Sequence, residues 1–185
     1  MSKKPYARPQ YKVKPAVIII VAVIVFIFAA LIVIIQPTDQ ERIYNAYNAA
    51  GSPNIQKDNV FESISTDKLI RVIETGVPVV VYFGTPSCTA CVSEIGWYDI
   101  EFESAGLKQE VEVIYYLKAD GMSDANKAKL QDKLGMALAA TPEVYYFNDG
   151  EIVTKRADAK YSDQADTMQL QIKKFFQDIK TSLAD

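Results

Sequence analysis

The chain of 185 residues contains no histidine and only two cysteines, Cys88 and Cys91. A structural zinc site usually takes four cysteine or histidine ligands, so one copy of this chain cannot supply such a site. A c-type haem requires histidine directly after the second cysteine of a C-x-x-C pair, and this chain has Val92 there. Two uses of the pair remain: a disulfide that staples the fold, and one that exchanges with substrates.

Charged and strongly polar side chains are absent from residues 16–35, AVIIIVAVIVFIFAALIVII. At ~1.5 Å per residue, a helix of this length spans the ~30 Å hydrocarbon core of a membrane. A cleaved secretory signal has a shorter apolar stretch of ~7–15 residues before a small-x-small cleavage site. The residues after this run offer no such site and no cysteine for a lipid anchor. We therefore expect an uncleaved transmembrane helix over residues 16–35.

Acidic residues are absent before this run, where five bases occur: Lys3, Lys4, Arg8, Lys12 and Lys14. The twenty residues after the run contain one base, Arg42. Cationic flanks stay in the cytoplasm, so residues 1–15 are predicted to be a cytoplasmic tail. The protein would then cross the cell membrane once, with residues 36–185 outside the cytoplasm.

The acidic balance of the outer part excludes some partners. Without the five N-terminal bases, the chain carries 15 bases against 23 acids, a net charge of −8. This argues against nucleic acid or an anionic membrane surface as its partner. The outer part, about 150 residues, is long enough to bury a core without cross-links. A disulfide across two residues also gains little loop-closure stabilisation, so the staple is the weaker interpretation.

Residues 36–58 are predicted to form a connector. It contains a short helix with Ile43, Tyr44 and Tyr47 on one side, and GSPN at residues 51–54 ends that helix. Residues 59–185 then alternate between strand and helix patterns. Strands are predicted over residues 59–64, 78–83, 111–117, 143–147 and 152–155, and helices over residues 66–75, 88–104, 123–134 and 168–183.

This alternation predicts an α/β fold with a parallel core built by right-handed crossovers. Residues 78–83, PVVVYF, are uninterruptedly apolar, as in a strand that is covered on both faces. Asn148, Asp149 and Gly150 indicate a hairpin turn that adds an antiparallel edge. We expect a mixed sheet with helices on both faces.

The two cysteines lie between the buried strand at residues 78–83 and the helix predicted from residue 88. The first N–H groups of a helix lack internal partners, and the helix dipole favours negative charge there. A thiolate at Cys88 would be stabilised, and the thiolate is the nucleophile of thiol–disulfide exchange. Cys91, in the first turn, could then resolve a mixed disulfide formed on Cys88.

The segments PVVVYFGTPSCTAC at residues 78–91 and ATPEVYYFNDGE at residues 140–151 resemble thioredoxin. The resemblance covers roughly residues 59–183 and implies a thioredoxin-like domain. In its architecture the chain is also similar to the membrane-anchored thioredoxin-like accessory proteins associated with bacteriocin export in Gram-positive bacteria.

The resemblance implies a membrane-anchored thiol–disulfide oxidoreductase that acts outside the cytoplasm on secreted peptides or proteins. Cys88 and Cys91 would be catalytic as a redox-active disulfide, with no metal or other cofactor and with an unidentified redox partner. Pro142 would be a cis proline beside the cysteines, and the backbone of Thr141 would pair with an extended substrate strand. An ordinary trans proline at a strand start is the alternative.

A second function class stays open. The same fold could serve as an accessory or binding module of an export system, presenting a groove near Pro142 while the disulfide is inert.

Several positions depart from the thioredoxin pattern. Ser87 replaces the usual tryptophan, and Thr89 and Ala90 replace the usual Gly-Pro. Tyr82 replaces the strand acid that accepts the proton of the buried cysteine. Glu94, one helical turn after Cys91, is a candidate for this proton transfer, although we expect a solvated helix residue there. For Trp97 we expect packing. The direction of electron transfer stays open.

Overall fold

The computed structural model describes residues 14–160 and 167–184, without the side chains of residues 32–35. The chain divides into two compact units, Met1–Pro37 and Thr38–Asp185. The first unit contains helix α1, Pro15–Ile35. Within the described residues, no helix is long and apolar enough to cross a membrane. The structure therefore does not support the transmembrane helix expected over residues 16–35, and anchoring stays a prediction from the sequence.

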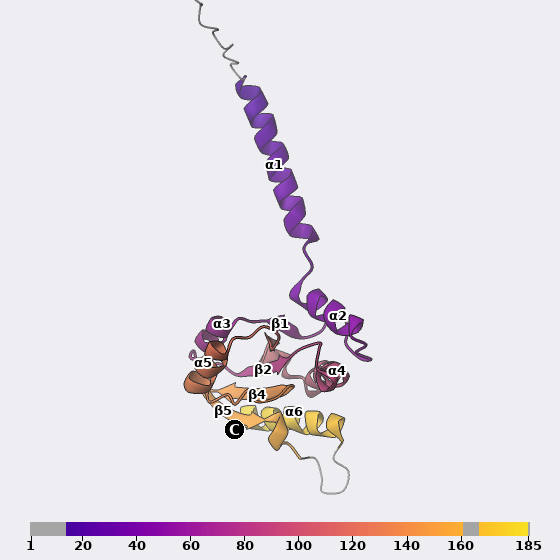
Figure 1. Ribbon diagram of the computed structural model, residues 1–185, viewed down its shortest axis with the longest axis vertical. Coiled ribbons are helices and arrows are strands. Elements are labelled where there is room, and N and C mark those ends of the chain that lie inside the picture. Colours follow the sequence, from indigo (N-terminus) through magenta and orange to yellow (C-terminus); the bar gives the residue numbers. More distant parts are fainter. Residues whose placement is uncertain (1–13, 161–166, 185) are drawn as a thin grey trace, which may run out of the picture. The chain divides into compact units, whose positions relative to one another are not determined.

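The second unit is built on a five-stranded mixed sheet with the strand order β1-β3-β2-β4-β5 (Figure 1). β1, β2 and β3 are mutually parallel where they pair, whereas β4 runs antiparallel to β2 and β5 antiparallel to β4. All six residues of the central strand β2 are buried, as the apolar run predicts. The strands are β1 Phe61–Ser63, β2 Val79–Gly84, β3 Ile114–Lys118, β4 Glu143–Asn148 and β5 Glu151–Lys155.

Helices cover both faces of this sheet, so the expected mixed α/β architecture is confirmed. On one face Val79, Val81 and Phe83 join a core with α3 and α5. On the other face Val80 and Tyr82 join a core with α2, α4 and α6. The helices are α2 Asp39–Ala49, α3 Thr66–Ile73, α4 Thr89–Ala105, α5 Asp124–Leu134 and α6 Met168–Ala184, with short 3₁₀ helices η1 Leu107–Gln109 and η2 Arg156–Asp158.

Helix α2 belongs to the folded unit, whereas the sequence pattern places residues 36–58 in a connector outside the domain. Its Ile43 and Tyr47 side chains are buried in the same core as α4 and α6. Asp39, its first residue, accepts a hydrogen bond from the backbone N–H of Ser63 at 3.3 Å. The folded unit therefore begins at Thr38, which caps the helix by accepting the N–H of Glu41. Because only two of the eleven side chains of α2 are buried, the sequence signal for this docking is weak.

Candidate redox site

The turn between β2 and α4 places Cys88 at the N-cap of α4, as the strand–turn–helix pattern predicts. Its Sγ accepts the backbone N–H of Cys91 at 3.3 Å. The Cys88 N–H donates to the carbonyl of Thr85 at 3.2 Å, which tightens the turn. The sulfur of Cys88 is therefore held at the end of a 17-residue helix where unpaired N–H groups favour negative charge.

The two sulfurs lie in different environments. Cys88 is half-buried, whereas Cys91 is fully buried in the core between the sheet and α4. Neither cysteine is disulfide-bonded in the structure. An accessible sulfur one helical turn from a buried one can meet a substrate first, while the other can act only on what the first has bound.

The pKa values of the two thiols move in opposite directions. Partial burial raises the pKa of Cys88, but hydrogen bonds with the side chain of Cys91, with Thr141 and with the backbone N–H groups of Cys91 and Ala90 together lower it by more. The pKa of Cys88 therefore lies below its ordinary value. Burial, followed by the hydrogen bond with Cys88, raises the pKa of Cys91 to about 11. Cys88 is thus the more acidic thiol of the pair and Cys91 the less acidic one.

The segment before β4 reaches the same place from 53 residues further along the chain. The Cys88 thiol donates a hydrogen bond to the carbonyl oxygen of Thr141 at 3.2 Å. The Thr141–Pro142 peptide bond is cis, as the resemblance implies. Both residues are half-buried, and Thr141 is the one that contacts the sulfur of Cys88. Substrate binding by Thr141 and Pro142 stays a prediction that this position favours.

The core that contains Cys91 also contains a group of buried tyrosines, which the sequence pattern does not reveal. The Tyr82 ring packs edge-on against Tyr98 and is stacked on Tyr116, with centroids 5.2 and 6.0 Å apart. The Tyr116 hydroxyl donates to the carbonyl of Gly84 at 3.1 Å. Gly84 has no room for a side chain, because a Cβ atom there would lie 2.4 Å from Cε1 of Tyr82.

Tyr82 cannot replace the missing strand acid as a base. Burial is the main cause that holds its pKa well above the ordinary tyrosine value. The phenol therefore stays protonated at neutral pH and cannot accept the proton of Cys91. The buried thiol of Cys91 therefore lacks a carboxylate on the strand below it.

Glu94 is buried, with 8% of its surface exposed, so the expectation of a solvated helix residue is wrong. Its Oε2 accepts a hydrogen bond from Nη2 of Arg156 at 3.1 Å. Arg156 is the first residue of η2 and lies 62 residues later in the chain. Burial raises the pKa of Glu94, and Arg156 opposes that rise. A buried carboxyl group thus lies one helical turn from Cys91, and its part in proton transfer stays a prediction.

A second network fixes the turn itself, and nothing in the sequence pattern indicates it. The Ser87 hydroxyl donates to Oδ1 of Asp120 at 3.0 Å, and the Thr85 hydroxyl lies 3.0 Å from that of Ser87. Hydrogen bonds from Thr85, then Ser87, hold the pKa of Asp120 below its usual range. The residue before Cys88 is therefore tied to an ionised carboxylate from the segment after β3.

The rest of α4 is anchored by further buried polar contacts. Asp99 accepts the backbone N–H of Val60 at 2.9 Å, and Glu101 accepts from Gln169 at 3.3 Å. Trp97 is half-buried and packs against the larger core, as expected. These contacts fix the helix that carries both cysteines.

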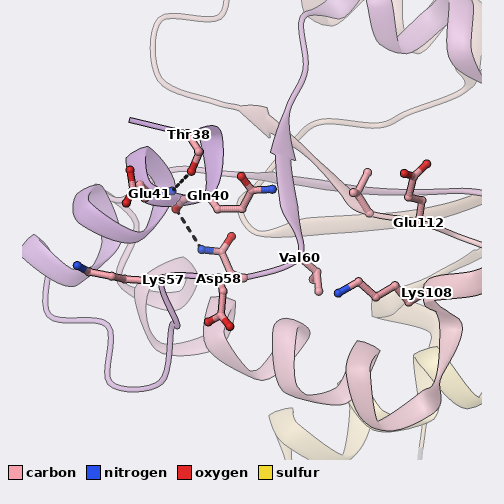
Figure 2. A pocket seen from close by; sticks show the side chains of 10 residues that line it. Thr38, Gln40, Glu41, Lys57, Asp58, Val60, Lys108 and Glu112 are labelled. Carbon is pink, nitrogen blue, oxygen red and sulfur yellow. Dashed lines mark hydrogen bonds between the residues drawn. The ribbon is translucent and has the colours of Figure 1, made fainter. Parts of the chain in front are cut away.

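A cavity of about 470 Å³ is lined by none of the residues of this site. Figure 2 shows the side chains that line it. Val60 and Val113 on its wall directly precede β1 and β3, so it lies at the amino ends of the parallel strands, whereas Cys88 follows the carboxyl end of β2. Its other lining residues are polar or charged, among them Gln40, Lys57 and Asp58. It therefore takes no part in the chemistry of the cysteines.

No protein-family model matches the chain, and no curated protein matches it. Among solved structures it is similar to thioredoxin O2 from Arabidopsis thaliana in the oxidized state, with 15% identity and a TM-score of 0.37. That match covers 52% of this chain and 81% of the other. It is also similar to the J-Trx1 fragment of ERdj5, with 10% identity and a TM-score of 0.38, over 68% of this chain. The chain spans about half the length of that fragment, 54%.

Proposed function

We propose that the protein is a thiol–disulfide oxidoreductase that acts through Cys88 and Cys91. One observation carries the proposal: an accessible sulfur at a helix N-cap accepts the N–H of Cys91, whose own sulfur is buried one turn below. The opposite pKa directions of the two thiols support it, because they fit one nucleophile and one resolving thiol.

In the reductive direction, the Cys88 thiolate attacks one sulfur of a substrate disulfide. A bond forms between Cys88 and that sulfur, the substrate S–S bond breaks, and the other substrate sulfur leaves as a thiolate that takes a proton from water. Cys91 then loses its proton and attacks the sulfur of Cys88. The Cys88–Cys91 disulfide forms as the remaining substrate thiolate leaves. The reverse sequence oxidises a substrate dithiol, and a partner of the thiol–disulfide class restores the starting state.

Glu94 is the candidate acceptor for the proton of Cys91. The carboxyl group is buried on the same helix, and Arg156 stabilises its ionised form. Glu94→Gln should then slow the resolution of the mixed disulfide while the first attack by Cys88 keeps its rate. Rapid-quench separation of the two steps measures this, and an unchanged resolution rate would remove Glu94 from the mechanism.

The proposed function is tested with full-length Cys91→Ser protein, which can form but not resolve a mixed disulfide. Incubation with oxidised peptides should give adducts on Cys88 by mass spectrometry, and Cys88→Ser is the matched control that should give none. Wild-type protein should reduce insulin in the presence of dithiothreitol or reshuffle a scrambled substrate. Absence of adducts together with absence of both activities would contradict the proposal.

The second candidate, a binding or accessory module with an inert disulfide, is favoured by one observation. The buried thiol has Tyr82 where thioredoxins carry an acid, and Tyr82 stays protonated. A redox titration separates the two functions. A Cys88–Cys91 potential below about −300 mV, where structural disulfides lie, would favour the binding module. A less negative potential, as oxidoreductases have, would favour the exchange function.

Secreted peptides or proteins are the proposed substrates, and the cell membrane is the proposed location, with the second unit outside the cytoplasm. These proposals depend on the charge distribution around residues 16–35. The resemblance to bacteriocin-export accessory proteins likewise stays a prediction.

A further inference from the structure

A carboxylate is fixed beside the nucleophilic cysteine. Asp120 is an exposed residue, yet its Oδ1 accepts a hydrogen bond from Ser87, the residue before Cys88. Ser87 is in turn 3.0 Å from the hydroxyl of Thr85, whose side chain is buried. The backbone adds to this, since the N–H of Ala119 donates to the carbonyl of Gly84 at 2.9 Å. The negative charge is therefore held in place rather than free on a flexible loop.

The carboxylate also borders a cavity of about 290 Å³ at the carboxyl ends of the parallel strands. Pro86 of the active-site turn, Tyr47 of α2 and Tyr116 of β3 line this cavity together with Asp120. The cavity thus lies next to the turn that carries Cys88, where a side chain of a polypeptide bound at Cys88 would meet the carboxylate.

Two cations face the same cavity and must be weighed against Asp120. Arg42 lies 3.6 Å from Asp39, so its charge is already compensated. Lys118 is an exposed residue whose charge also lowers the pKa of Asp120, although less than the hydrogen bonds from Thr85 and Ser87 do. Asp120 alone of these is held by hydrogen bonds to the active-site turn. The net charge of −8 beyond the N-terminal bases further favours cationic over anionic substrates.

We propose that Asp120 is a specificity-determining residue, which selects disulfide substrates that carry a lysine or arginine side chain next to the attacked sulfur. The inference rests on the proposed exchange function, because it concerns the substrate that meets Cys88. A fixed carboxylate loses little conformational entropy on pairing with the incoming cation, and it repels an acidic side chain at the same place.

The experiment uses full-length Cys91→Ser protein and three synthetic peptides, acetyl-Gly-X-Cys-Gly-amide with X as lysine, glutamine or glutamate. Each peptide is presented as a mixed disulfide with 2-nitro-5-thiobenzoate. The Cys88 thiolate attacks the peptide sulfur, the peptide–aryl S–S bond breaks, and the aryl thiolate leaves with the electron pair and is followed by its absorbance. At low ionic strength the lysine peptide should react about threefold to tenfold faster than the glutamate peptide.

Asp120→Asn keeps an oxygen that accepts the Ser87 hydrogen bond but removes the charge. The ratio of the lysine to the glutamate rate should fall by about threefold. Because the ratio compares two substrates of one variant, a change in the thiolate fraction of Cys88 cancels. Asp120→Lys should lower the ratio further. Asp124→Asn removes an equal charge from the exposed start of α5 and is the matched control, whose ratio should stay at the wild-type value.

The outcomes separate this inference from the proposed function. If all three peptides react with the protein but the ratio is the same in wild type, Asp120→Asn and Asp120→Lys, the inference is overturned and the exchange function stands. A fall of the ratio in Asp124→Asn as large as in Asp120→Asn also overturns it, since net charge alone would then explain the selection. If no peptide reacts at Cys88, the exchange function itself fails.

Discussion

The division of roles proposed for the two sulfurs depends on single residues, and it predicts a large difference in their alkylation rates. With a pKa of about 11, only about one part in a thousand of Cys91 is thiolate at pH 8, whereas the pKa of Cys88 lies below its ordinary value. Iodoacetamide should therefore modify Cys88 of the reduced protein at least tenfold faster than Cys91 at pH 8. Peptide mapping by mass spectrometry after timed quenching measures both rates.

The matched control is Cys91→Ala, which removes the thiol that donates to Cys88. The pKa of Cys88 should rise in this variant, so its alkylation rate should reach its plateau at higher pH than in the wild type. Similar rates at both cysteines in the wild type, or a Cys88 profile unchanged by Cys91→Ala, would contradict the assignment of roles.

The pair of Glu94 and Arg156 gives a second prediction at this scale. Arg156→Gln leaves the buried carboxyl group without its cation, so the free energy of unfolding should fall by about 1–3 kcal/mol. Adding Glu94→Gln should recover part of this loss, because no buried charge then lacks a partner. Urea unfolding of the two single variants and the double variant measures the coupling between the residues.

Lys108→Gln is the control for that comparison. Lys108 pairs with Glu103 at 3.3 Å, but both side chains are more than half exposed, so this loss should be within about 0.5 kcal/mol. If the loss of stability in Arg156→Gln is no larger than this, the buried pair does not stabilise the fold more than an exposed pair.

The residues of the site differ in how far the sequence predicts them. Cys88 and Cys91 are found from local pattern, since a short apolar run, a turn and a helix start lie within fifteen residues of each other, residues 78–92. Arg156 and Asp120 could not be found in this way. Their contacts to Glu94 and Ser87 join residues 62 and 33 positions apart, and a single sequence carries no periodic signal for such pairs.

At the scale of elements, periodicity predicts the helices and strands well where one face is apolar. The four most buried side chains of α6, Ile172, Phe175, Phe176 and Ile179, belong to the apolar face expected from their spacing. Helix α4 is different, because Glu94, Asp99 and Glu101 are buried on it along with apolar residues. Charged residues normally indicate a solvated face, which is why the pattern placed Glu94 in solvent.

Close packing of α4 against the segment before β1 predicts the effect of a single methyl group. A Cβ atom on Gly96 would lie 2.5 Å from the carbonyl carbon of Asn54 and 2.7 Å from the nitrogen of Ile55. Alanine normally stabilises a helix by about 1 kcal/mol relative to glycine. Because the contact here is with backbone, the clash should win, and Gly96→Ala should destabilise the protein by about 1–3 kcal/mol.

Thermal or urea unfolding measures this effect, with Ser93→Ala as the control on the same helix. Ser93 is exposed, so its substitution should leave stability unchanged or slightly raised. Stabilisation by Gly96→Ala would mean that the segment of Asn54 and Ile55 does not pack closely enough against α4 to clash with a Cβ atom at residue 96.

For the whole molecule, the second compact unit begins at Thr38. The sequence pattern predicts the start of the thioredoxin-like domain 21 residues later, at residue 59. What the sequence missed is that α2 is docked on the domain core. Its polar composition hides two buried side chains, and one of them, Tyr47, packs against Tyr116, which lies 69 residues later in the chain.

The charge asymmetry of the chain predicts its orientation, and the cysteine content allows a direct test. Since Cys88 and Cys91 are the only cysteines, a membrane-impermeant maleimide should label the mildly reduced wild-type protein in intact cells. The control is Ser2→Cys in a Cys88→Ser, Cys91→Ser background, which should be labelled only after lysis, because cationic flanks stay in the cytoplasm. The labelled wild-type protein should sediment with membranes and resist carbonate extraction. Labelling of the Ser2→Cys variant in intact cells would contradict the orientation, and recovery of a shortened chain in the soluble secreted fraction would contradict the anchor.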